Sequence, residues 1–309
     1  MTDTKPTAIV LMGPTASGKT ALSVAMAQTL NAEIISVDSA LVYQGMDIGT
    51  AKPTLAERGG IPHHLIDILD PAESFSTGQF RARALDLMAD ITNRGKLPLL
   101  VGGTMLYFSA LTQGLAKLPE ADAGIRQILD QALLEQGKEA LHARLAQVDP
   151  TAAARIHVND PQRIQRALEV YEISGRPLSS FFETDQQTEQ PFQFIKLMIA
   201  PQQRQTLHLK IAERFKQMLA QGFLDEVKVL QARGDLDDSM PSIRCVGYRQ
   251  AWSYLNGEYD YDSMQDKAII ATRQLAKRQF TWLRKETDAV QLISESQDLL
   301  QTAVRHCHS

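Results

Sequence analysis

The sequence predicts an α/β fold: a P-loop core with a parallel sheet flanked by helices, plus an inserted all-helical domain. Short apolar runs alternate with segments of helical spacing along residues 7–112, which is typical of a parallel sheet. The stretch GPTASGKT follows the first apolar run and opens the first helix. Residues 117–188 carry helical patterns alone. We therefore expect the core at 1–116 and 191–309 and the insertion at 117–190.

The first part of the core supplies three strands and three helices. Continuous apolar runs predict buried strands at residues 7–12, 33–37 and 97–103. Helical spacing predicts helices at residues 19–30, at 80–95 and from 104 onward. Gly95 is expected to end the second helix. The apolar face of the first helix is expected to comprise Leu22, Ala25, Met26, Thr29 and Leu30.

The insertion and the C-terminal part are predominantly helical in pattern. The clearest helix spans residues 159–175, where Asn159 or Asp160 caps the start, Pro161 suits the first turn and Gly175 ends it. Residues 192–200 predict one further core strand. The tail is predicted to be helical, with long amphipathic helices at residues 207–222 and 262–285.

Composition limits the classes of function. The chain has 309 residues and a net charge of −4, so a nucleic-acid site would have to be a local basic patch. Cys245 and Cys307 have no metal-site spacing, and the chain is expected to be a reduced, cytoplasmic protein. The apolar run at residues 8–12 is too short for a signal or membrane segment, so we expect no membrane partner.

The P-loop matches the pattern G-x-x-x-x-G-K-[ST] from Gly13 to Thr20. Glycines let backbone N–H groups converge on phosphate oxygens, Lys19 supplies a positive charge, and the Thr20 hydroxyl is suited to bind Mg²⁺. The following helix adds its N-terminal dipole. The predicted phosphate-binding residues are Gly13, Pro14, Thr15, Ala16, Ser17, Gly18, Lys19 and Thr20.

The candidate carboxylate of this site follows the strand at residues 33–37 and not the strand at residues 97–103. An NTPase usually holds Mg²⁺ with an acidic residue after a second apolar strand. Here the strand at 97–103 ends in glycines and Thr104, whereas the strand at 33–37 ends in Asp38. Strand ends carry the sites of open α/β sheets, so Asp38 is a candidate general base or metal-associated group. The alternative is a turn cap.

Basic residues gather late in the sequence. On a helix, Arg273, Lys277 and Arg284 lie within about 40° of one another at ~100° per residue, with Trp282 nearby. Such a stripe suits contacts with nucleic-acid phosphates. A solubilising surface is the alternative. Arg163 and Arg166 are i,i+3 neighbours on the inserted helix.

Several long blocks together carry a resemblance. They are GPTASGKT, ISVDSALVYQGMDIGTAKP, LLVGGTMLYF, NDPQRIQRALEVYEISG, PSIRCVGYRQ and ATRQLAKRQFTWLR. Across residues 8–285 the chain resembles the bacterial tRNA dimethylallyltransferase family. The resemblance implies transfer of a dimethylallyl group from dimethylallyl diphosphate to the exocyclic N6 amine of adenosine 37 of tRNA, with release of diphosphate. The P-loop would hold the donor diphosphate with Mg²⁺.

The resemblance also implies roles for individual residues. Asp38 matches the family's base, Thr104 a second contact to the adenine amine, and Arg214 a diphosphate contact. Lys19 completes the catalytic set. From the residues alone, Arg214 on an amphipathic helix would more often be solvated.

The implied tRNA contacts include Asp38 and Thr104 and extend over further blocks. Base flipping would bring the adenine to Asp38. The partners would be the anticodon stem-loop and the prenyl diphosphate, and we expect a monomer. The implied contacts are Asp38, Ser39, Ala40, Leu41, Thr104, Arg126, Gln162, Arg163, Ile164, Gln165, Arg166, Arg244, Cys245, Val246, Gly247, Tyr248, Arg249, Lys277, Arg278, Gln279, Phe280, Thr281, Trp282, Leu283 and Arg284.

Three alternative functions remain open at this stage. A small-molecule kinase would use the same loop, a nucleotide-gated RNA-binding module would bind tRNA without catalysis, and a close variant would prenylate free AMP, ADP or ATP. Cys245 could be read as a nucleophile, but the absence of a nearby histidine favours packing or an RNA contact. His63 and His64 lack a third ligand at metal spacing, so we interpret them as structural.

Overall fold

The computed structural model describes residues 5–184 and 190–308, and the chain divides into two compact units. The core unit comprises Met1–Thr112 and Gln190–Ser309, and the insertion unit comprises Gln113–Glu189. Each unit has its own hydrophobic core, so each is described by itself.

The predicted parallel sheet flanked by helices is confirmed. In the part of the chain that the structure describes, six strands form one sheet in the order β3-β2-β4-β1-β5-β6, and every neighbouring pair is parallel. The strands are β1 (Thr7–Met12), β2 (Ala32–Val37), β3 (His63–His64), β4 (Leu97–Gly102), β5 (Gln193–Ala200) and β6 (Val290–Ile293).

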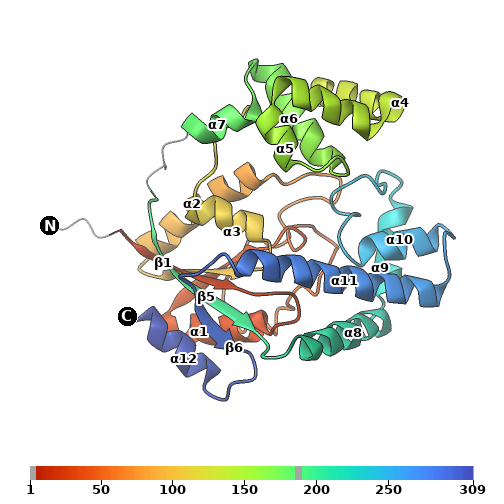
Figure 1. The fold of residues 1–309 in the computed structure, drawn as a ribbon. Helices are drawn as coiled ribbons and strands as arrows, with labels where there is room; N and C mark the ends of the chain where they lie inside the picture. Colours follow the sequence, from red (N-terminus) through yellow and green to blue (C-terminus); the bar gives the residue numbers. More distant parts are fainter. Residues whose placement is uncertain (1–4, 185–189, 309) are drawn as a thin grey trace. The chain divides into compact units, whose positions relative to one another are not determined.

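Helices cover both faces of the sheet, which the continuous apolar strands require. One face carries α1 (Lys19–Leu30) and α12 (Leu299–Cys307), and the other carries α2 (Thr77–Asn93) and α3 (Met105–Thr112) (Figure 1). One detail of the predicted α1 face is wrong. Thr29 is exposed and its hydroxyl donates to Ala25 O, while Ser23 and Ala27 are buried, because both the sheet and α12 pack on this helix.

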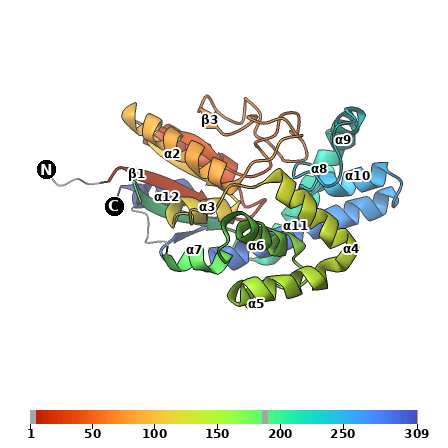
Figure 2. The same cartoon turned by 90° about the horizontal axis from the view of Figure 1, so that it is seen from above.

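A group of four helices packs on the long segment that follows β2. They are α8 (Arg204–Ala220), α9 (Phe223–Ala232), α10 (Tyr248–Leu255) and α11 (Tyr261–Leu283). Figure 2 shows them together at one end of the core unit. Their shared core includes Tyr43, Phe223 and Tyr248, whose rings are almost fully buried. This packing brings C-terminal helices to the loops that leave the sheet.

The tail contains a strand that the sequence analysis missed. β6 lies at Val290–Ile293 and pairs with β5, so the predicted all-helical tail is wrong there. A four-residue run is too short for its apolar pattern to distinguish a strand from a turn. Among the helices that the structure describes, none is both long enough and apolar enough to cross a bilayer.

The insertion unit consists of α4 (Ala123–Val148), α5 (Pro150–Arg155), α6 (Pro161–Ser174) and α7 (Leu178–Thr184). The predicted signals on α6 are confirmed. The Asp160 side chain accepts a hydrogen bond from Arg163 N, Pro161 occupies the first turn, and Gly175 ends the helix with φ 66°. Within α4, Gly137 has φ 81° and interrupts the helix.

Candidate active site

Three adjacent strands end at one edge of the core sheet. β2, β4 and β1 are neighbours, and Val37, Gly102 and Met12 share one register across them. The next residues along these strands open the Asp38 segment, the Thr104 turn and the P-loop. The three predicted parts of the site therefore begin side by side, at the edge where parallel sheets bind their ligands.

Glycine lets the ends of β2 and β4 pack closely. Thr104 N donates to Val37 O at 3.2 Å. A Cβ atom added at Gly102 would lie 2.0 Å from Val37 O, so no side chain fits there. β4 thus ends without the carboxylate that an NTPase usually places beside its P-loop.

The P-loop has the backbone of a phosphate cradle. A Cβ atom added at Gly13 would lie 2.4 Å from Ile199 O of β5, so only glycine fits. Ala16 and Gly18 both have left-handed backbone, with φ 62° and 89°. Such a succession of conformations turns N–H groups toward a common centre. Lys19 Nζ donates to Gly13 O at 2.9 Å and to Pro14 O at 2.6 Å, which holds the ammonium against the loop.

Two cations and one carboxylate lie at this loop. Burial lowers the pKa of Lys19 to about 8; the charge of Asp38 opposes this shift and the charge of Arg214 adds to it. Burial also lowers the pKa of Arg214, against the charges of Asp38 and Glu57. Arg214 of α8 is half-buried and interacts electrostatically with Lys19 and Asp38, unlike an arginine on a fully solvated helix face. Partly dehydrated cations beside a P-loop favour a bound polyanion.

Asp38 forms a turn and keeps part of its carboxylate available. Its Oδ1 accepts hydrogen bonds from Ala40 N at 2.8 Å and Leu41 N at 3.4 Å, so the turn-cap interpretation is correct for this oxygen. Within the described residues, Oδ2 accepts no hydrogen bond. Thr104 Oγ1 accepts from Ser39 N at 3.0 Å. The ends of β2 and β4 are thus tied together beside the half-buried Asp38.

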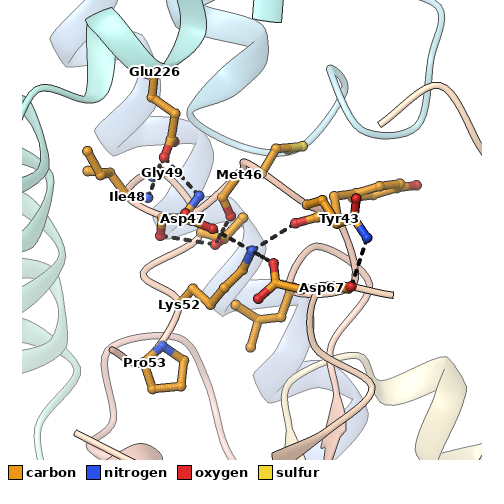
Figure 3. A network of polar contacts seen from close by, with 12 residues as sticks. Tyr43, Met46, Asp47, Ile48, Gly49, Lys52, Pro53, Asp67 and Glu226 are labelled. Atoms are coloured by element: carbon orange, nitrogen blue, oxygen red, sulfur yellow. Dashed lines mark hydrogen bonds and ion pairs between the residues drawn. The ribbon is translucent and has the colours of Figure 1, made fainter. Parts of the chain in front are cut away.

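The sequence analysis missed Glu226, which fixes the segment after Asp38 (Figure 3). Its carboxylate accepts hydrogen bonds from Asp47 N at 2.8 Å, Ile48 N at 2.7 Å and Gly49 N at 3.1 Å. The Tyr248 hydroxyl donates to the same carboxylate at 2.5 Å. Nothing marks Glu226 in the sequence, because a single glutamate on an amphipathic helix is ordinarily solvated.

Lys52 holds the same segment from its other side (Figure 3). Its Nζ donates to Tyr43 O at 2.8 Å, to Asp47 Oδ1 at 2.6 Å and to Asp67 Oδ1, and the side chain is only 4% exposed. Gly49 lies between these two anchors, and a Cβ atom there would lie 2.2 Å from the Phe223 ring. The unusual block DSALVYQGMDIGTAKP is thus a loop built around buried polar contacts.

Helix α11 presents most of the predicted basic stripe to solvent. Lys277, Arg278 and Arg284 are exposed, and Lys285 lies 5.4 Å from the centre of the Trp282 ring. Arg273 differs from the prediction, because its Nε atom is buried on the inner side of the helix without a hydrogen-bond partner. The exposed stripe therefore begins at residue 277.

Four of the implied tRNA contacts have buried side chains. Ile164, Tyr248 and Leu283 are 0%, 0% and 2% exposed, and Gln279 is 7% exposed. Tyr248 bonds to Glu226, whereas Ile164 and Leu283 belong to hydrophobic cores, so these three side chains offer no surface to RNA. Helical spacing alone could not reveal which side of each block faces inward.

The block at residues 244–249 is part surface and part core. Arg244 and Arg249 are exposed. Burial raises the pKa of the Cys245 thiol to about 12, which keeps it protonated and disfavours the nucleophile interpretation. Its Sγ lies 3.5 Å from Pro241 O. Cys245 is therefore a packing residue in this structure.

In the insertion unit, two of the predicted tRNA-contacting arginines form ion pairs with one buried carboxylate. Arg126 and Arg166 both bond to Glu169, whose side chain is 1% exposed, at 2.9 Å and 2.6 Å. Arg163 pairs with Asp160 at 3.1 Å and is mostly exposed. Two arginines share one carboxylate, so this group of three side chains carries one net positive charge.

The donor set suits Mg²⁺ bound mainly through a substrate. In the described ranges, no group of three or more His, Cys, Asp or Glu residues is arranged to hold a metal. His64 bonds to Glu33 at 2.8 Å, and Arg94 holds the pKa of Glu33 well below its usual range, so His64 belongs to an ion-pair cluster at the other end of β2. Thr20 is exposed at the P-loop. Mg²⁺ there would complete its coordination with phosphate oxygens and water.

The fold and the site define a P-loop protein in which the carboxylate of Asp38 follows β2, separated from the P-loop strand β1 by β4. Comparison with known proteins agrees with this class. Residues 41–286 match the IPP transferase family. The chain is 58% identical over 300 residues to the tRNA dimethylallyltransferase of Methylococcus capsulatus, covering 97% of this chain and 96% of that protein. The chain therefore belongs to the IPP transferase family.

Solved structures support the same assignment. A tRNA isopentenylpyrophosphate transferase from Staphylococcus epidermidis is 38% identical, has a TM-score of 0.71 and is matched over 98% of both chains. A eukaryotic dimethylallyltransferase acting on tRNA is 27% identical with a TM-score of 0.82, over 98% of this chain and 77% of that one.

Proposed function

We propose that this chain is a tRNA dimethylallyltransferase. It transfers the dimethylallyl group of dimethylallyl diphosphate to N6 of adenosine 37 in the anticodon loop and releases diphosphate. The observation that carries this proposal is the placement of the P-loop, Lys19 and Arg214 beside Asp38 and Thr104. Relatives that share more than half of their residues with this chain are tRNA dimethylallyltransferases.

The chemistry assigns one task to each part of the site. The bond between the prenyl carbon and the diphosphate oxygen breaks while a bond from N6 to that carbon forms. Lys19, Arg214 and the P-loop amides receive the negative charge that develops on diphosphate. Mg²⁺ at Thr20 supplies further charge neutralisation when bound. The alkylated amine becomes acidic, and the open oxygen of Asp38 accepts its proton.

Thr104 positions the acceptor amine. Its Oγ1 accepts from Ser39 N at 3.0 Å and donates to Ser39 Oγ over a long 3.4 Å contact, which the hydroxyl would give up by rotating to donate to an adenine nitrogen near Asp38. An adenine stacked within an anticodon loop cannot reach this strand end, so the base must be flipped out. The proposed tRNA surface of the core unit comprises the exposed basic residues Arg244, Arg249, Lys277, Arg278 and Arg284.

The alternatives have weaker support. The chain lacks the carboxylate that a kinase would place here, because β4 ends at Gly102 and is followed by Gly103 and Thr104. Prenylation of a free nucleotide would leave the exposed cations of α11 unused. We expect the enzyme to act as a monomer in the cytoplasm, where its tRNA substrate is modified.

Mass spectrometry of tRNA nucleosides provides the test. The enzyme is incubated with unmodified tRNA, Mg²⁺ and dimethylallyl diphosphate, and a dimethylallyl group on the adenosine next to the anticodon is expected. AMP and ATP serve as competing acceptors in parallel reactions. Prenylated free nucleotide without prenylated tRNA, or ADP formed from ATP, would contradict the proposal.

A further inference from the structure

A buried glutamine connects two loops of the active site. Gln279 lies on α11 and is 7% exposed. Its Oε1 accepts a hydrogen bond from Thr15 N of the P-loop at 2.9 Å, and its Nε2 donates to Gly103 O after β4 at 2.9 Å. Both ends of the amide are therefore used, as burial of an amide requires.

The contact with Gly103 is closely fitted. A Cβ atom added at Gly103 would lie 2.4 Å from Gln279 Nε2, so a side chain there would displace the glutamine. Gly103 directly precedes Thr104, which in turn holds Ser39 N. Hydrogen bonds and the Gly103–Thr104 peptide link thus connect the P-loop through Gln279 to the segment that carries Asp38.

We propose that Gln279 is a positioning residue that sets the distance between the P-loop and the acceptor groups Asp38 and Thr104. This proposal rests on the proposed function. Alkyl transfer requires the prenyl carbon, held through its diphosphate, to meet the adenine amine in line with the leaving oxygen. β1 and β4 pair as far as Met12 and Gly102, and beyond that pair Gln279 bridges the P-loop and Gly103. Misplacement of the reacting groups by about 1 Å can cost roughly a hundredfold in rate.

The proposal gives Gln279 a different role from the residues next to it in the sequence. Lys277, Arg278 and Thr281 are exposed, whereas Gln279 faces the loops. The exposed residues are expected to affect tRNA affinity. Gln279 is expected to affect the chemical step and the binding of diphosphate, with tRNA affinity unchanged.

Two substitutions at this position test the role. Gln279→Met keeps the shape and removes both hydrogen bonds, so we expect a roughly 10–100-fold slower single turnover at saturating substrates. Binding of inorganic diphosphate, measured by calorimetry, should weaken severalfold, and the tRNA dissociation constant should stay within twofold. Gln265→Met, a partly buried glutamine on the same helix, is the control for helix stability.

Gln279→Glu adds a readout that loss of packing would not produce. A protonated glutamic acid can accept from Thr15 N and donate to Gly103 O as glutamine does, whereas the carboxylate cannot donate. Burial raises the pKa of such a carboxyl group. The rate of Gln279→Glu relative to the wild type should therefore rise as the pH falls from 8 to 6.

The measurements test the positioning role of Gln279 independently of the proposed function. Weaker tRNA binding by Gln279→Met with a normal single-turnover rate would identify a tRNA contact and overturn the positioning role. Unchanged diphosphate binding, or a pH-independent rate ratio for Gln279→Glu, would overturn it as well. If the wild type binds diphosphate but prenylates no tRNA, the proposed function fails, and the diphosphate measurement still judges Gln279.

Discussion

The P-loop and the loop after β2 lie at the same edge of the core sheet, but they are held in different ways. The P-loop takes its form from its own backbone, with left-handed residues and a lysine that bonds to carbonyls five and six residues before it. The loop after β2 depends on a distant residue, because Glu226 accepts from Ile48 N across 178 positions of the chain, in addition to the contacts of the loop's own Lys52. A locally determined loop can be recognised in a sequence, whereas one determined by distant contacts cannot.

The largest expected effect is on the single-turnover rate, after substitution of Asp38 at the start of the loop that follows β2. Asp38→Asn keeps the shape and removes the base, so single turnover should slow by roughly 10²–10⁴-fold, while donor affinity stays nearly unchanged. Quenched-flow measurements across a Mg²⁺ titration check this. Thr20→Ala is the comparison, because it should weaken donor binding in a metal-dependent way. Near-normal turnover by Asp38→Asn would rule out the base role.

The next effect tests how the second loop is held. Glu226→Ala leaves three backbone N–H groups and the Tyr248 hydroxyl without their acceptor, so the free energy of unfolding should fall by about 2–4 kcal/mol. Urea denaturation measures it. Asp225→Ala changes the neighbouring exposed carboxylate and should shift stability by less than about 0.5 kcal/mol. Equal losses in the two variants would show that the loop is held by other contacts.

The P-loop should respond to pH instead. The pKa of Lys19 is lowered to about 8, and diphosphate binds the protonated amine, so above pH 8 binding must be accompanied by proton uptake. Affinity for inorganic diphosphate should therefore be roughly tenfold weaker at pH 9 than at pH 7. Calorimetry in buffers of different ionisation enthalpy measures both affinity and proton uptake. The Lys19→Met variant should bind diphosphate weakly at every pH. If its affinity still fell with rising pH as that of the wild type does, the titrating group would be a residue other than Lys19.

The smallest effect concerns the outer face of α11. Lys277→Ala removes one exposed cation, so tRNA affinity should fall severalfold and the slope of log affinity against log salt should decrease by about 1. Fluorescence anisotropy with an anticodon stem-loop measures this. Lys267→Ala, near the start of the same helix, is the matched control. A slower chemical step with unchanged tRNA affinity would contradict the proposed surface.

The sequence predicted those features that depend on nearby residues. β1, β2 and β4 are continuous apolar runs, and the P-loop and Asp38 follow two of them directly, so their common location at one edge of the sheet followed from the strands being parallel. The contact between Thr15 and Gln279 joins residues 264 positions apart, and no periodicity encodes it. Glu226 and β6 could not be predicted from the sequence either, because their roles depend on contacts with distant parts of the chain.

Close packing at the end of β4 has a consequence for how this chain can change over evolution. A nucleotide hydrolase needs an acidic side chain near that position, yet a Cβ atom at Gly102 would meet Val37 O at 2.0 Å, and one at Gly103 would meet Gln279 at 2.4 Å. Aspartate at position 102 would require the backbone of β2 to move, and aspartate at position 103 would displace the Gln279 side chain from its hydrogen bonds. Single-step mutation therefore cannot convert this transferase into an ATPase along that route, and its chemistry is protected by the geometry of its backbone.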